Sequence, residues 1–201
     1  SVMLPETNKT PDPSATRLSQ MLANFGSMLS NRAYAGYVLT IIGSFSGLFA
    51  YLLGASFVLV DQLGMSPTAF GLSFGFASVG FMSGAFLGSR IVRRLGIERM
   101  CLIGTSFTAF SGILIFRLIW GGYITPVSAI LPPVIYFFGM GLSQPNIQAG
   151  AISPFPHMAG AAAALLGLAQ YISAGLFSVI VGVFAFDPTL LMATVMGASG
   201  V

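Results

Sequence analysis

From about residue 33 onward, long apolar stretches alternate with short polar breaks. Five stretches, at about 33–54, 67–88, 100–120, 124–147 and 157–184, are long enough to cross a bilayer, which takes about 20 apolar residues. A sixth stretch begins near Thr189 and runs to the last residue of the sequence. Because lipid cannot bond backbone N–H and C=O groups, such spans must be helical. The pattern predicts an all-α integral membrane bundle with an incomplete last helix.

The first 32 residues differ from the rest because they are polar. Residues 5–32 contain three prolines, and Pro11 and Pro13 are expected to break any long helix. The segment is therefore predicted to lie outside the bilayer, with residues 33–201 forming the membrane bundle.

The composition agrees with a membrane protein. Only 6% of the 201 residues are charged, 55% are hydrophobic and the mean hydropathy is +0.89. Such a chain cannot cover a water-facing surface with polar groups, and disorder requires low hydrophobicity. The net charge of +3 comes from cations that are too scattered to bind nucleic acid.

The positions of the cations predict the orientation. Lys9, Arg17 and Arg32 precede the first span, and four arginines follow the second span: Arg90, Arg93, Arg94 and Arg99. Both groups lie on one side of the membrane if each stretch crosses once, and the positive-inside rule makes that side cytoplasmic. The loop at 89–99 is therefore predicted to be cytoplasmic.

Small residues recur at helical spacing on two spans. Gly80 and Gly84 lie on the second span, and Gly160, Gly167 and Ala174 lie on nearly one face of the fifth. Such residues let helix backbones approach closely in lipid. They indicate either static packing or faces that slide and hinge, and the total of 25 glycines favours motion.

Polar and aromatic residues on three spans predict a cavity. Polar side chains are costly inside a membrane, and binding sites for bulky lipophilic ligands combine apolar walls with a few polar groups. Interhelical hydrogen bonds and lipid contacts are the alternative for each residue taken singly. The expected lining is Phe45, Tyr51, Tyr136, Gln144, Asn146, Gln170 and Tyr171.

No pattern in the sequence predicts catalysis, a metal site or a cofactor. After Ala33 the acidic residues are Asp61, Glu98 and Asp187, all placed at loops or helix ends. His157 is expected in a solvated loop without a second metal ligand or a nucleophile beside it. The single cysteine, Cys101, allows no internal disulfide. The protein is not expected to be an enzyme.

Two segments carry a family resemblance. The segments 131–146, which ends in Gly-Leu-Ser-Gln-Pro-Asn, and 156–170, which begins Pro-His-Met-Ala-Gly-Ala, resemble helices ten and eleven of the major facilitator superfamily. They are most similar to the bicyclomycin-resistance (Bcr/CflA) branch of the drug:proton antiporters. Residues 49–58 and 64–71 agree with this resemblance, and Leu4-Pro5-Glu6-Thr7 resembles the end of helix six.

The resemblance implies the C-terminal half of a twelve-helix transporter: the end of helix six and the central linker in residues 1–32, then helices seven to twelve. It implies proton-coupled export of lipophilic drugs by alternating access in a bacterial inner membrane. The implied partners are these drugs, protons, the bilayer and an N-terminal six-helix half, which carries the proton-binding carboxylates. The spans are free of acidic residues, which agrees with that placement.

Two other functions remain open. Uptake of a metabolite or a sugar would require a more polar cavity lining, because a hydroxyl-rich solute must regain the hydrogen bonds that it makes with water. A membrane-embedded structural subunit would not need amides that face each other on separate helices.

Overall fold

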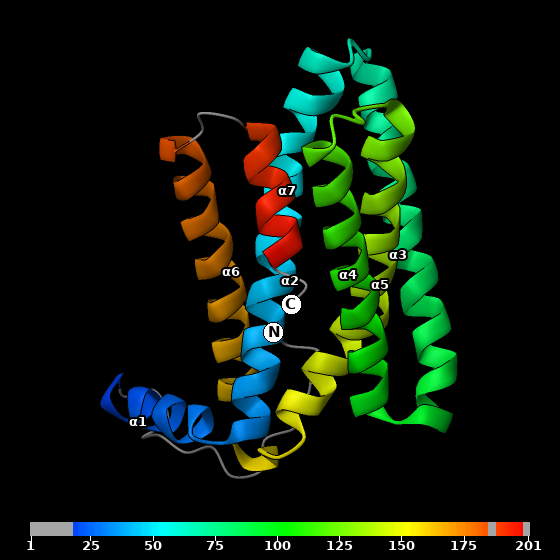
Figure 1. Cartoon of the computed structure of the whole chain (residues 1–201). Helices are drawn as coiled ribbons and strands as arrows, with labels where there is room; N and C mark the ends of the chain where they lie inside the picture. Colours follow the sequence, from blue (N-terminus) through cyan, green and yellow to red (C-terminus); the bar gives the residue numbers. More distant parts are fainter. Residues whose placement is uncertain (1–17, 185–187, 199–201) are drawn as a thin grey trace, which may run out of the picture.

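The computed structural model describes residues 18–184 and 188–198, which form a helical bundle (Figure 1). A π-helical turn, η2 (Phe57–Gln62), extends α2, and a 3-10 turn, η3 (Pro156–Met158), precedes α6. The α-helices are α1 (Leu18–Leu29), α2 (Arg32–Ser56), α3 (Pro67–Leu95), α4 (Ile97–Trp120), α5 (Pro126–Ile152), α6 (Ala159–Phe184) and α7 (Pro188–Ala198).

In the part of the chain that the structure describes, five helical segments are long and apolar enough to cross a membrane, and they coincide with the five predicted stretches. Several extend beyond the predicted ends; α3, for example, continues through Arg93 and Arg94 to Leu95. The sixth predicted stretch contains α7. The chain is thus an all-α, multi-pass membrane protein.

Side-chain caps at the N-termini show why three spans begin where they do. The Asn31 side chain accepts hydrogen bonds from the first backbone N–H groups of α2, and Ser66 caps α3 ahead of Pro67. Thr125 and Ser128 form a reciprocal capping box at the start of α5. These caps satisfy backbone donors that have no partner within the helix.

The helix α1 was not predicted from the sequence. It lies across one end of α2 (Figure 1), where Met28 is fully buried and Phe25 packs against the same apolar cluster. Residues 18–29 contain no proline, so Pro11 and Pro13 lie upstream of the helix and do not interrupt it. The predicted end of helix six falls in residues 1–17, outside the described residues.

The spans pack in two groups. Helix α5 packs closely against α3 and α4, while α2 packs against α6 and α7. Contacts of α7 with α4, and of α2 with α5, join the groups. About half of the most apolar window of α2 and of α5 is buried, against about a quarter for α3, α4 and α6. Helices α2 and α5 are therefore the central pair.

Glycines allow the backbones of α3 and α5 to come into direct contact. A Cβ added to Gly80 would lie 2.7 Å from the Val134 carbonyl oxygen, and one added to Gly84 would overlap the Phe138 carbonyl. Gly141 of α5 meets α3 in the same way at the Phe81 carbonyl. Gly80 and Gly84 therefore lie at close contacts between two helix backbones. Gly141 lies at a third such contact, which was not predicted.

The small residues of α6 behave differently. A Cβ at Gly160 or Gly167 would meet nothing within 4 Å, so neither glycine mediates close helix packing among the described residues. Ala174 is buried. The sequence prediction of a packing or sliding face on α6 therefore has no partner helix at these two glycines among the described residues, and it stays a prediction. Any hinge role of these residues stays a prediction.

Candidate functional site

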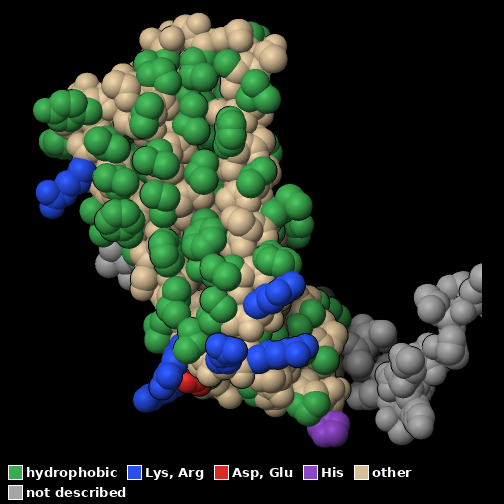
Figure 2. Space-filling model, turned by 90° about the vertical axis from the view of Figure 1, so that its right-hand side faces the viewer, with side chains coloured by type: hydrophobic (Ala, Val, Ile, Leu, Met, Phe, Trp, Pro, Cys, Tyr) green, Lys and Arg blue, Asp and Glu red, His purple; other side chains and the backbone are tan. Residues whose placement is uncertain are grey.

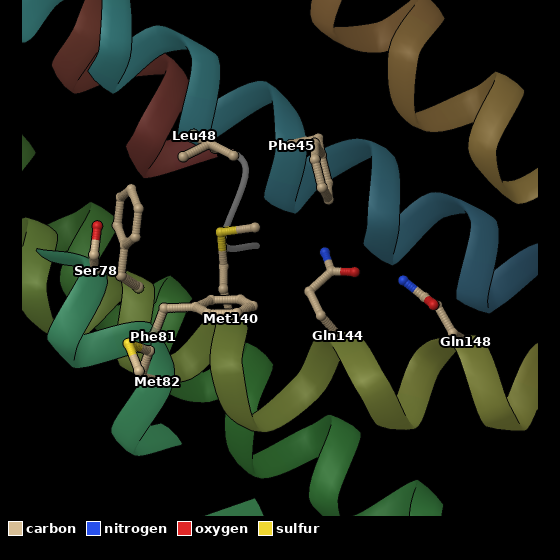
Figure 3. Close-up of a pocket in the computed structure, with 9 residues that line it drawn as sticks. Phe45, Leu48, Ser78, Phe81, Met82, Met140, Gln144 and Gln148 are labelled. Carbon is tan, nitrogen blue, oxygen red and sulfur yellow. The ribbon is translucent and has the colours of Figure 1, made fainter. Parts of the chain in front are cut away.

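A cavity of about 350 Å³ lies where α2, α3 and α5 meet. Its wall is mainly aromatic and aliphatic, with Met, Leu and Phe side chains from all three helices (Figure 3). The lining residues are Phe45, Leu48, Ser78, Phe81, Met82, Phe137, Met140, Gln144 and Gln148. This volume is within the range of small-molecule sites, about 300–1,000 Å³.

The glycine contacts described above position the α3 wall of the cavity. Gly141 touches the backbone of α3 at Phe81, whose side chain lines the cavity together with that of Met82. A bulkier residue at 141 would push this wall away from α5. The close approach of the two helices therefore sets the cavity width.

Gln144 is the most unusual residue of the site. Its side chain projects from α5 toward Phe45 of α2 (Figure 3), and only 5% of its surface is exposed. Neither Nε2 nor Oε1 of its amide has a hydrogen-bond partner among the described residues. A buried amide left without partners costs about 1–3 kcal/mol. Gln144 therefore holds an unused donor and an unused acceptor at the cavity.

Two further polar residues line the cavity. Gln148 lies one turn beyond Gln144 on α5 and points toward the same side (Figure 3). Ser78 contributes from α3, where its hydroxyl donates to the Phe74 carbonyl at 3.0 Å. The sequence prediction missed both, although the four-residue spacing of the two glutamines could have identified Gln148.

Two of the predicted lining residues are placed in the core instead. Tyr136 is fully buried and its hydroxyl donates to the Ser44 carbonyl at 2.9 Å, which joins α5 to α2. Tyr51 packs edge to face against Phe137, with ring centroids 5.8 Å apart. The two tyrosines therefore support the cavity wall from behind.

The remaining predicted residues do not line this cavity. The Asn146 amide donates at 2.7 Å to the Leu142 carbonyl of its own helix and is not among the lining residues. Gln170 is half-buried on α6, and Tyr171 is 69% exposed on the chain's outer surface. Of the seven predicted residues, the structure thus brings only Phe45 and Gln144 into the cavity wall.

Charged residues concentrate at one end of the bundle (Figure 2). Arg90, Arg93 and Arg94 at the end of α3, and Arg99 at the start of α4, are all exposed. The Arg90 guanidinium lies over the Phe86 ring, 4.7 Å from its centroid. Exposed apolar side chains cover the surface above this end, as expected for helices that face lipid (Figure 2).

The described residues contain no group of three metal-ligating side chains. His157 is exposed in η3, and Cys101 is a buried free cysteine. Among the described residues, the cavity lining has no ionisable side chain. It offers a ligand apolar contacts and a few amide and hydroxyl groups.

Comparison with known proteins agrees with this architecture. The profile of the Major Facilitator Superfamily matches residues 2–178. The chain is 31% identical over 183 residues to the uncharacterised MFS-type transporter YdgK of Bacillus subtilis (strain 168), a match covering 90% of this chain and 44% of that protein. No solved structure matches significantly.

Two further relatives carry names of resistance proteins. One is a bicyclomycin resistance protein homolog of Haemophilus influenzae, 28% identical over 98% of this chain and 49% of that protein. The other is multidrug resistance protein D of Escherichia coli (strain K12), 27% identical over 87% of this chain and 43% of that protein. The chain thus spans about half the length of these relatives, and it belongs to the major facilitator superfamily.

Proposed function

We propose that this chain is the C-terminal half of a proton-coupled multidrug efflux transporter that exports lipophilic compounds by alternating access. The observation that carries the proposal is the apolar cavity between α2, α3 and α5, with its buried, unpartnered amide at Gln144. Apolar walls with few polar groups suit lipophilic ligands. The names of two relatives, a bicyclomycin resistance protein homolog and multidrug resistance protein D, support the same class.

In this proposal the spans are helices seven to twelve, and an N-terminal six-helix half completes the transport path. Proton coupling rests on the resemblance to the drug:proton antiporters, and the proton-binding carboxylates would lie in the other half. Transport requires that proton and drug bind the inward-open and outward-open states with different affinities.

The proposed membrane is the bacterial inner membrane, with residues 89–99 on the cytoplasmic side. The sequence predicted a loop at 89–99, but the structure places these residues in the end of α3 and the start of α4, joined at Gly96. The exposed arginines at this end support that orientation by the positive-inside rule. The same arginines are available to bind anionic lipid headgroups. Trp120 and Tyr123, both exposed near the ends of α4 and α5, suit the opposite interface.

Uptake of a sugar or another polar metabolite is the alternative, and a non-transporting structural subunit is another. A sugar would bring many hydroxyl groups into a cavity whose polar side chains are Ser78, Gln144 and Gln148. Most of those hydroxyls would lose their hydrogen bonds to water without replacement, at about 1–3 kcal/mol each. The lining therefore favours a lipophilic compound.

Inverted membrane vesicles with an acidic lumen would test the proposal. The protein is expressed from its complete gene, and lipophilic cations, chloramphenicol-like neutral compounds and bicyclic antibiotics are added singly. A quenched fluorescent dye reports lumenal pH. A drug-dependent loss of the gradient, absent from vesicles without the protein, would support proton-coupled export. Folded protein that responds to none of the compounds would favour metabolite transport or a structural role.

A further inference from the structure

The polar atoms of Gln144 indicate which functional group a lipophilic ligand of this cavity should carry. The residue is 95% buried, and both the Nε2 donor and the Oε1 acceptor of its amide are unpartnered among the described residues. Phe45 and Met140, which line the cavity beside it, are apolar and offer no hydrogen bond. A ligand that fills the cavity is therefore in a position to satisfy both atoms.

A primary amide is best satisfied by a group that presents an acceptor and a donor side by side. A carboxamide or a lactam does this, because its C=O accepts from Nε2 while its N–H donates to Oε1. A ketone or an ether supplies only the acceptor and leaves Oε1 buried without a donor. Sites built to hydrogen-bond a ligand discriminate strongly against analogues that lack the matching group.

The charge of the lining is equally informative. No Asp, Glu, Lys, Arg or His of the described chain lines the cavity, so this lining offers no counter-ion to a charged ligand. Moving an unpaired ion into such a site is far more costly than moving a neutral amide. The lining thus selects a neutral ligand.

Resting on the proposed function, we infer that Gln144 is a specificity-determining residue that selects neutral lipophilic compounds carrying a carboxamide or lactam group. The hydrophobic part of the ligand lies against Phe45, Phe81 and Met140, and its amide pairs with the Gln144 side chain. Gln148, one turn away, lines the same side of the cavity and is available to a second polar group of the ligand.

Equilibrium binding tests the inference without requiring transport. The protein, expressed from its complete gene and purified in detergent, is titrated with 1-naphthamide and with 1-acetylnaphthalene. The second probe replaces the amide NH2 with a methyl group of similar size. Both are also titrated against Gln144→Met, which removes the amide and keeps the side-chain length. The four dissociation constants form a double-mutant cycle: the preference of the wild type for the amide over the ketone is divided by the same preference of Gln144→Met. The difference in lipophilicity between the probes cancels in this quotient, which is the cycle factor.

The expected result is that the wild type favours the amide probe over the ketone by about tenfold more than Gln144→Met does. Gln144→Asn, with a shorter amide, should retain part of this factor, and Phe110→Ala, at an exposed position of α4 outside the cavity, should retain all of it. A cycle factor near one would overturn the inference, as would wild-type protein that fails to bind the amide probe. If the cycle factor is about ten but no compound dissipates the pH gradient in vesicles, the inference about Gln144 stands and only the proposed proton-coupled export is contradicted.

Discussion

The Tyr136 hydroxyl donates a hydrogen bond to the main-chain carbonyl of Ser44, at 2.9 Å. This contact joins α5 to α2 next to Phe45, which follows Ser44 in the chain and lines the cavity. Both partners are buried, so water does not compete for the bond. The two central helices are thus fixed to each other directly behind the candidate site.

Removing this hydroxyl should weaken the contact between the central helices. Tyr136→Phe keeps the ring and loses the buried hydrogen bond to the Ser44 carbonyl, and a bond of this kind is worth about 1 kcal/mol. We expect a lower midpoint of thermal unfolding in detergent. Tyr171→Phe removes a hydroxyl from an exposed tyrosine of α6 and should leave the midpoint unchanged. Equal midpoints for Tyr136→Phe and the wild type would show that the bond contributes nothing.

The packing of α3 on α5 should depend on Gly84 but not on Gly75. A methyl group at Gly84 would overlap the Phe138 carbonyl, whereas one at Gly75 would meet nothing within 4 Å. We expect Gly84→Ala to destabilise the protein by about 1–3 kcal/mol, the usual cost of overpacking. Gly75→Ala should be neutral or slightly stabilising, because alanine favours helix. Unfolding midpoints of the two variants provide the comparison; a Gly84→Ala variant as stable as Gly75→Ala would contradict close packing at this seam.

Phe45 should contribute to ligand binding through its ring. Phe45→Ala removes an aromatic wall of the cavity and should weaken binding of lipophilic probes by roughly tenfold, in line with the area that the ring buries. Phe110→Ala, on the exposed surface of α4, serves as the matched control and should bind normally. Probe titration of purified protein measures both. If the two variants bind alike, the cavity is not the ligand site.

The proposed orientation predicts which side of the membrane each end faces. In a background in which Cys101 and any cysteine of the N-terminal half are replaced by serine, Arg94→Cys should react with a membrane-impermeant maleimide in inverted vesicles but not in intact cells. Tyr123→Cys should show the reverse pattern. Both positions are exposed on the protein surface, so the membrane itself is the only barrier between the reagent and each cysteine. The opposite result for the pair would invert the topology and place the arginines outside.

Sequence reasoning located the spans well because their determinant is local. About 20 consecutive apolar residues form a helix long enough to cross a bilayer, whatever the rest of the chain contains. It failed at α1, since Met28 and Phe25 become structural anchors only when α2 and α6 provide an apolar surface for them. Helix formation there depends on that tertiary contact, which no local pattern shows.

The cavity lining was predictable only in part. Gln144 and Asn146 are two residues apart on α5, so their side chains point about 160° apart around the helix, and both cannot face one cavity. The sequence does not state which of them faces α2, because that depends on how α5 is rotated in the bundle. The structure turns Gln144 into the cavity and leaves Asn146 to bond its own helix.

The sequence by itself therefore determined the membrane class, the positions of the spans and the concentration of arginines at one end, because each follows from hydropathy and charge along the chain. Only the tertiary structure decided which glycines carry close contacts, which tyrosines belong to the core and which amide remains without partners. The reason is that these properties depend on the rotation and separation of neighbouring helices, which many distant residues set together.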